Sequence, residues 1–218
     1  MGGSTSIRIF QSIDRPAQDL LDRFRDAPTG FVADAFSHGN AMWHRIKPLD
    51  PAWRICGPAV TVKTRVGDNL LVWKALDIVQ PGDVQRAIWG DRTSAVASAR
   101  GVVGMVTDGV VRDVAGILDA GMPIFSQGSI PQACYMDGPG EINVPVSAGG
   151  VLVHPGDIVV GDRDGVVVVP AARAVEVADA LDEVCKRESD AEAAIARDPR
   201  VPESVDRILA TMDVATFD

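Results

Sequence analysis

The chain has 218 residues, of which 46% are hydrophobic and 23% are charged, so it can bury one sizeable core. We expect a single domain over residues 1–218, with a flexible leader over residues 1–12 and a tail over residues 198–218. The formal net charge of −9 argues against nucleic acid as a partner, because proteins that bind its backbone carry basic patches. There is no apolar stretch of about 18 residues and no secretory signal, so we expect no membrane partner and a cytoplasmic location.

Common catalytic motifs and cysteine frameworks are absent from the sequence. Cys56, Cys134 and Cys185 are widely spaced and odd in number, which favours reduced thiols over disulfides or a zinc site. The sequence contains no GxxxxGK[ST], no GxGxxG after a strand, no HExxH and no GxSxG. Phosphate-loop, zinc-protease and serine-hydrolase chemistry therefore have little support.

Hydrophobic patterning predicts helices on both sides of a β-rich middle. Asp14 and Asp68 are the expected N-caps of the first and third helices. Helices are predicted over residues 16–24, 29–36, 69–78, 92–100, 114–120 and 171–197. A half-buried strand is predicted over residues 55–64 and a buried one over 102–107. Short strands are predicted over residues 124–125, 142–146, 151–153, 158–160 and 166–169, with a hairpin turn at Asp164-Gly165. This order indicates a layered α/β sandwich.

A polar segment follows the buried strand over residues 102–107. It reads Asp108-Gly109-Val110-Val111-Arg112-Asp113 and leads into a short helix. In α/β folds, the loops after strands hold ligand sites on a rigid scaffold. Its carboxylates could hold Mg²⁺, and the guanidinium could grip a carboxylate through two parallel hydrogen bonds. The alternative is a solvated turn, and these residues alone leave both interpretations open.

A set of short motifs resembles the RraA-like family, over roughly Thr29 to Arg197. The family includes metal-dependent 4-hydroxy-4-methyl-2-oxoglutarate aldolases, which also decarboxylate oxaloacetate, and the regulator of ribonuclease E activity A. The motifs, in order, are Gly57-Pro58-Ala59-Val60-Thr61, Gly67-Asp68-Asn69-Leu70, Pro81-Gly82-Asp83, Trp89-Gly90-Asp91, Asp108 to Asp113, Gly149-Gly150-Val151, Pro155-Gly156-Asp157 and Asp162-Arg163-Asp164-Gly165-Val166. The resemblance implies a layered β/β/α sandwich, similar to swivelling domains, with flanking N- and C-terminal helices.

The aldolase branch of the family carries an Asp, then twenty residues, then Arg-Asp. Asp91, Arg112 and Asp113 meet this pattern. By resemblance, Asp113 is the metal ligand and Arg112 contacts the keto acid. The segment Gly90-Asp91-Arg92-Thr93 supplies backbone N–H groups to the substrate carboxylate, a role that suits a helix N-terminus.

The family's metal shell is completed through water by a C-terminal glutamate of a neighbouring subunit. Glu188 falls in the corresponding helix and Glu192 is the alternative, although either could be an ordinary surface charge. The resemblance therefore implies a divalent metal cation, Mg²⁺ or Mn²⁺, and a homotrimer or a dimer of trimers.

Two positions depart from the family pattern. Gly116 stands where the aldolases usually have an acidic residue, which predicts a missing carboxylate near the arginine or the metal. About ten residues, a strand and a glycine-rich turn, are absent between Val84 and Gln85. Either the protein has lost this segment or the sequence omits it. We favour omission, because a core strand is rarely lost without penalty.

Together these features predict a lyase that releases pyruvate from a small 2-keto acid. Asp91, or a water that it orients, is the candidate for proton transfer at the departing hydroxyl. The competing hypothesis is a non-enzymatic regulator that binds and inhibits a ribonuclease or another RNA-processing partner. A third hypothesis is a catalytically idle scaffold.

Overall fold

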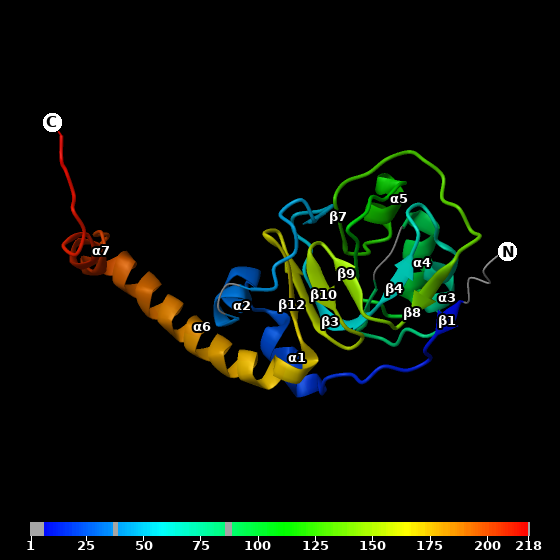
Figure 1. The fold of residues 1–218 in the computed structure, drawn as a ribbon, viewed down its shortest axis with the longest axis horizontal. Helices are drawn as coiled ribbons and strands as arrows, with labels where there is room; N and C mark the ends of the chain where they lie inside the picture. The colour runs from blue at the N-terminus through cyan, green and yellow to red at the C-terminus, as the bar shows by residue number, and fades with distance from the viewer. Residues whose placement is uncertain (1–6, 37–38, 86–88, 218) are drawn as a thin grey trace. The chain divides into compact units, whose positions relative to one another are not determined.

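The computed structural model describes residues 7–36, 39–85 and 89–217 (Figure 1). Its contacts divide the chain into two compact units, Met1–Leu181 and Asp182–Asp218, and one helix, α6, runs through the boundary. The expectation of a single domain stays a prediction.

The helices are α1 Gln18–Arg25, α2 Thr29–Ala35, α3 Leu70–Ala75, α4 Asp91–Ala99, α5 Val114–Asp119, the 3-10 helix η1 Ala171–Arg173, α6 Ala174–Arg197 and α7 Glu203–Leu209.

The first unit is built on a seven-stranded mixed sheet of order β12-β11-β3-β5-β6-β7-β2. Its four central strands, β3, β5, β6 and β7, run parallel to one another. The strands of this sheet are β2 Lys47–Pro48, β3 Ile55–Val60, β5 Val84–Gln85, β6 Gly104–Val106, β7 Ile124–Ser126, β11 Ile158–Asp162 and β12 Gly165–Val169. The remaining strands form two small sheets, β1 Arg8–Ile9 with β8 Gly140–Ile142 and β4 Val62–Thr64, and β9 Val146–Ala148 with β10 Val151–Val153.

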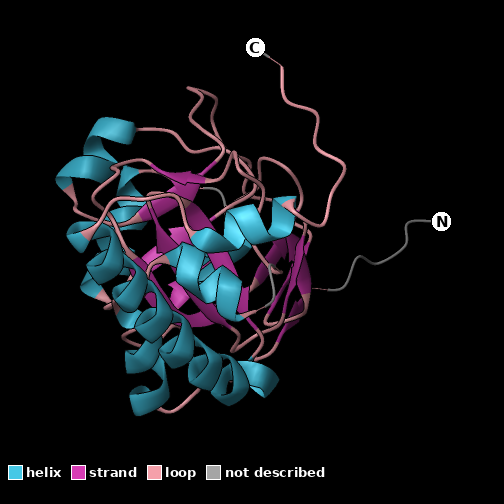
Figure 2. Cartoon of the chain, turned by 90° about the vertical axis from the view of Figure 1, so that its left-hand side faces the viewer, coloured by secondary structure: helices cyan, strands magenta, loops and turns pink. Residues whose placement is uncertain are grey.

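Alternating valines of β12 show how the layers are arranged. Val166 and Val168 pack with the β9 and β10 residues, whereas Val167 and Val169 pack with α1, α2 and the start of α6. Successive side chains of a strand point to opposite faces, so helices cover one face of the sheet and β9–β10 covers the other. Figure 1 places α1 and α2 beside β12, and Figure 2 shows the strands gathered together. The layered β/β/α sandwich is confirmed.

Several local predictions need correction. The strand over residues 55–64 is two strands, and all six residues of β3 are buried because both faces of the sheet are covered. The N-cap of α1 is Ala17 and not Asp14, because the chain is still extended at Ala17, with ψ of 149°. The N-cap of α3 is Asn69 and not Asp68. The predicted hairpin is confirmed, since β11 and β12 pair antiparallel, but its two-residue turn is Arg163-Asp164, because Gly165 already pairs with Asp162.

The ends of the chain carry more structure than expected. Within the expected leader, Arg8–Ile9 forms β1, which pairs parallel with β8, so this part is ordered by backbone hydrogen bonds. Residues 1–6 lie outside the described part of the chain. Within the expected tail, residues 203–209 form α7. Across the described residues, no helix has the length and apolar character needed to cross a membrane.

Candidate active site

Two segments meet where the central parallel strands end. Trp89 and Gly90 precede α4, and Thr107 to Asp113 follow β6. The N–H of Arg112 donates to the carbonyl of Trp89 at 3.2 Å, which ties the segments together. The carboxyl ends of parallel strands share one edge of a sheet, the usual place for a ligand in an α/β fold.

The N-terminus of α4 is held by its own polar groups. The Gly90 N–H donates to Oγ1 of Thr93 at 3.0 Å, and this hydroxyl donates back to the Gly90 carbonyl at 2.9 Å. The indole N–H of the buried Trp89 donates to Oγ of Ser94 at 2.7 Å. The Thr93 side chain is thus committed within the helix, so only its backbone can face a ligand.

Asp113 adopts a left-handed backbone conformation, with φ of 60°, directly before α5. Asp tolerates this region better than most residues, and such conformations are frequent at functional sites. Nε of Arg112 donates to Oδ2 of Asp113 at 3.0 Å. A Cβ at Gly90 would lie 3.0 Å from the same oxygen, so a glycine at position 90 lets Asp113 approach α4.

Gly116 has a steric explanation in the structure. A Cβ added there would lie 2.7 Å from Cβ of Asp91 and 3.4 Å from its Oδ2. The Asp91 side chain therefore occupies the space beside α5 into which a residue at position 116 would extend. The sequence prediction that a carboxylate is missing near the arginine or the metal stays a prediction, since this contact explains only why position 116 holds a glycine.

A cavity of about 230 Å³ brings the predicted residues together. Gly90, Asp91, Arg92, Thr93, Arg112 and Asp113 all line it. Two of the expected backbone donors are directed to the protein itself: the Gly90 N–H to Oγ1 of Thr93 at 3.0 Å and the Arg92 N–H to Oδ1 of Asp91 at 2.6 Å. The cavity also includes residues that sequence reasoning missed: Asn69, Trp73, Ala133, Cys134 and Met136. The last three come from an irregular loop, for which no sequence pattern gave a signal.

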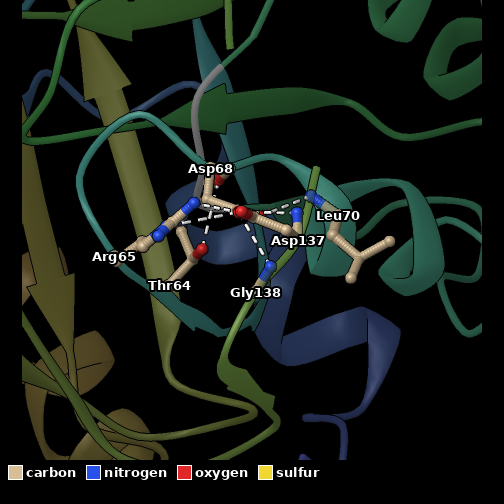
Figure 3. Close-up of polar contacts among 6 residues, drawn as sticks. All are labelled: Thr64, Arg65, Asp68, Leu70, Asp137 and Gly138. Carbon is tan, nitrogen blue, oxygen red and sulfur yellow. Dashed lines mark hydrogen bonds and ion pairs between the residues drawn. The ribbon is translucent and has the colours of Figure 1, made fainter. Parts of the chain in front are cut away.

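Asp68 anchors that loop, as Figure 3 shows. Its buried carboxylate accepts from the backbone N–H groups of Leu70, Asp137 and Gly138, at 2.9, 3.0 and 2.8 Å, and forms an ion pair with Arg65 at 3.4 Å. Burial alone would raise the pKa of Asp68, but these hydrogen bonds outweigh it and hold the pKa below its ordinary value. Asp68 thus joins the start of α3 to the cavity wall.

Cys134 lies in the same loop and lines the cavity beside Arg112. Burial raises the pKa of its thiol, Asp113 adds to that effect, and Arg112 opposes it. The thiol is thus the favoured form near neutral pH, which disfavours a nucleophilic role.

Asp113 offers the donor chemistry that a hard divalent cation requires. Its carboxylate is 38% exposed at the cavity, and no group of three His, Cys, Asp or Glu able to hold a metal occurs within residues 7–36, 39–85 and 89–217. Mg²⁺ is commonly bound through one or two carboxylates, with water and substrate oxygens completing the shell, so Asp113 fits Mg²⁺ or Mn²⁺. Glu188 pairs with Arg187 in the second unit, and its role as a ligand, like that of Glu192, stays a prediction.

Residues 29–168 match the family described as "RraA-like: Aldolase/RraA". The chain belongs to the RraA-like family. A relative from Halalkalibacterium halodurans, named "Putative 4-hydroxy-4-methyl-2-oxoglutarate aldolase", is 39% identical over 80% of this chain and 86% of its own. The "4-hydroxy-4-methyl-2-oxoglutarate aldolase" of Thermus thermophilus is 27% identical over 66% of this chain and 93% of its own.

A solved structure shares the fold of this RraA-like chain. It is Streptomyces coelicolor RraAS2, described as an unusual member of the RNase ES inhibitor RraA protein family. The similarity has a TM-score of 0.73 and 28% identity, and it covers 83% of this chain and 99% of that one. Relatives of this chain are thus named both as aldolases and as inhibitors of an RNase.

Proposed function

We propose that this chain is a divalent-metal-dependent lyase that cleaves a carbon–carbon bond in a 2-keto acid and releases pyruvate. The observation that carries the proposal is the convergence of Asp91, Arg112, Asp113 and the α4 N-terminus on one cavity. Its substrates would be 4-hydroxy-4-methyl-2-oxoglutarate or a similar 4-hydroxy-2-oxo acid, and oxaloacetate.

The chain's own residues divide the work between binding and charge stabilisation. The α4 N-terminus carries partial positive charge and faces the substrate carboxylate. The guanidinium of Arg112 stabilises the negative charge that develops on the pyruvyl oxygens as the bond breaks. Asp91 accepts the proton of the C4 hydroxyl. Asp113, with Glu188 of a neighbouring subunit through water, would hold Mg²⁺ or Mn²⁺, which supplies Lewis acidity at the keto group.

The first test follows pyruvate release from oxaloacetate and from 4-hydroxy-4-methyl-2-oxoglutarate, with Mg²⁺ or with EDTA. We expect turnover with Mg²⁺ and a loss of about 100-fold or more in Asp113→Asn, since Asn also tolerates the left-handed backbone but binds the cation weakly. Asp119→Asn, at the other end of α5, is the matched control and should retain wild-type activity. Turnover that survives both EDTA and Asp113→Asn would refute the metal assignment.

The second candidate is a protein that inhibits an RNA-processing enzyme, and it is favoured by the similarity to the Streptomyces structure. The net charge of −9 suits a basic protein partner. Inhibition of a ribonuclease by a well-folded preparation that turns over neither keto acid would support this candidate over the lyase.

A further inference from the structure

The cavity of the candidate site contains four charged residues in its described lining. They are Asp91, Arg92, Arg112 and Asp113. Arg112 is paired with Asp113 at 3.0 Å, and Asp91 accepts the backbone N–H of Arg92 through Oδ1 at 2.6 Å. Across residues 7–36, 39–85 and 89–217, no carboxylate pairs with the guanidinium of Arg92. Arg92 is thus the unpaired cation of the described lining.

The position of Arg92 in α4 does not favour a cation. Arg92 is the second residue of the helix and is exposed. The N-terminus of a helix carries partial positive charge, so Asp and Glu stabilise the first turn and Arg does not. Arg112 brings a further positive charge to the same cavity. The stability of α4 therefore does not explain an arginine at position 92.

The two aspartates of the cavity are held by other contacts. Asp113 accepts a hydrogen bond from Nε of Arg112. Asp91 lies against α5, where a Cβ at position 116 would be 2.7 Å from its Cβ and 3.4 Å from its Oδ2. A guanidinium presents its N–H donors in a planar fork that matches the two oxygens of a carboxylate. A ligand with a carboxylate can therefore supply the partner that Arg92 lacks within the described chain.

The proposed mechanism brings a carboxylate close to Arg92. In 4-hydroxy-4-methyl-2-oxoglutarate, C4 carries both the hydroxyl group and the second carboxylate. Asp91 accepts the proton of that hydroxyl in the proposed mechanism, and the Cα atoms of neighbouring residues are about 3.8 Å apart. A substrate whose C4 hydroxyl lies at Asp91 thus has its second carboxylate within reach of the long Arg92 side chain.

We propose that the guanidinium of Arg92 binds the second carboxylate of the substrate, the one remote from the keto group. Arg92 then determines specificity, because a 2-keto acid without this carboxylate leaves the guanidinium without its partner. The inference rests on the proposed lyase function, since that function supplies the keto-acid ligand. It gives the Arg92 side chain a role separate from that of its backbone N–H, which is directed to Asp91.

The test compares two ligands that cannot undergo retro-aldol cleavage because both lack the C4 hydroxyl. These are 2-oxoglutarate and 2-oxopentanoate, which have the same chain length and differ in whether C5 is a carboxylate or a methyl group. Titration calorimetry on the full chain with Mg²⁺ measures both dissociation constants. We expect 2-oxoglutarate to bind about tenfold more tightly or better, because charge-assisted hydrogen bonds hold its second carboxylate.

Arg92→Gln removes the charge and keeps a good helix former. It should abolish the preference for 2-oxoglutarate and leave binding of 2-oxopentanoate within about twofold of wild type, which also shows that the variant is folded. Arg92→Lys keeps the charge without the planar fork and should restore part of the preference. Arg45→Gln is the matched control, since it loses the same charge at an exposed position outside the described lining of the cavity. This control should keep the preference.

Oxaloacetate turnover by the wild type, measured in parallel, separates this inference from the proposed function. Equal binding of the two ligands, or binding of neither, by a chain that turns over oxaloacetate would overturn the inference alone. A preference that Arg92→Gln leaves intact would also overturn it. If oxaloacetate is not cleaved but the preference exists and is lost in Arg92→Gln, the lyase assignment fails and the carboxylate site at Arg92 stands.

Discussion

Asp91 has two structural contacts that constrain its chemistry. Its Oδ1 accepts the Arg92 N–H at 2.6 Å, and its Cβ lies against the backbone of Gly116. These contacts hold the carboxylate between α4 and α5, in the cavity that Asp113 also lines. A fixed carboxylate beside a bound substrate is placed to accept a proton, whereas a mobile one would not be preorganised.

The proposed role of Asp91 predicts different effects on the two reactions. Retro-aldol cleavage requires removal of the hydroxyl proton, but loss of CO₂ from oxaloacetate requires no base. Asp91→Asn keeps an oxygen for the Arg92 N–H, so the fold should persist. We expect kcat for 4-hydroxy-4-methyl-2-oxoglutarate to fall about 100-fold, and kcat for oxaloacetate to change only a few-fold. Steady-state pyruvate assays measure both, and equal losses would rule out the proton-transfer role.

The site residues that belong to a motif of fixed spacing were predictable from the sequence. Asp91, Arg112 and Asp113 were predicted from their spacing by resemblance, and the structure places all three on one cavity. The left-handed backbone of Asp113 and the contact between Asp91 and Gly116 were not predictable, since both depend on how α4 packs against α5.

At the scale of elements, the loop that carries Ala133, Cys134 and Met136 shows where sequence patterns fail. Helices and strands leave a periodic signal, and α2, α4 and α5 begin within one residue of their predicted starts. A loop has no period, and its course here is fixed by hydrogen bonds to Asp68, about 70 residues earlier. β5 has two described residues, Val84–Gln85, and residues 86–88 lie outside the described chain, so the apparent gap after Val84 stays a prediction.

Asp68 should contribute stability through this loop. Asp68→Asn weakens three charge-assisted hydrogen bonds and an ion pair, so we expect the free energy of unfolding to fall by about 2 kcal/mol at pH 7. Urea unfolding at a fixed protein concentration measures it. Asp77→Asn is the control, because that exposed carboxylate pairs with the surface side chains Lys74 and Arg100 and should change stability by less than about 0.5 kcal/mol.

The pH dependence gives a second test of Asp68. Its pKa is lowered in the folded chain, so its stabilisation is present above the ordinary Asp value of about 3.9 and is lost as the pH falls through the lower folded value. The difference between wild type and Asp68→Asn should therefore be constant from pH 7 to 5 and shrink below about pH 4. An undiminished difference at pH 3 would contradict the role of the charge.

At the scale of the whole molecule, the layered fold followed from the order of the predicted elements and the family resemblance. The division into two compact units could not be predicted from the sequence, because the periodic pattern of α6 continues across the boundary at Leu181. Positions 174, 177, 178, 181 and 184 on this helix are buried, whereas the described residues beyond Glu188 are exposed. We propose, from the family resemblance, that Glu188 completes the site of a neighbouring subunit, and this proposal can be tested by complementation.

Glu188→Gln and Asp113→Asn should each lose most of the aldolase activity, and co-expression should restore part of it. If each site takes Asp113 from one subunit and Glu188 from its neighbour, random mixing leaves about one quarter of the sites with both natural residues. Purification through two different tags removes oligomers of a single type, so we expect about a third of wild-type activity for a trimer and about a quarter for a dimer of trimers. Co-expressed Asp113→Asn and Asp91→Asn should show no rescue, because both residues line the cavity of one subunit. Full activity of Glu188→Gln alone would exclude Glu188 and shift the assignment to Glu192.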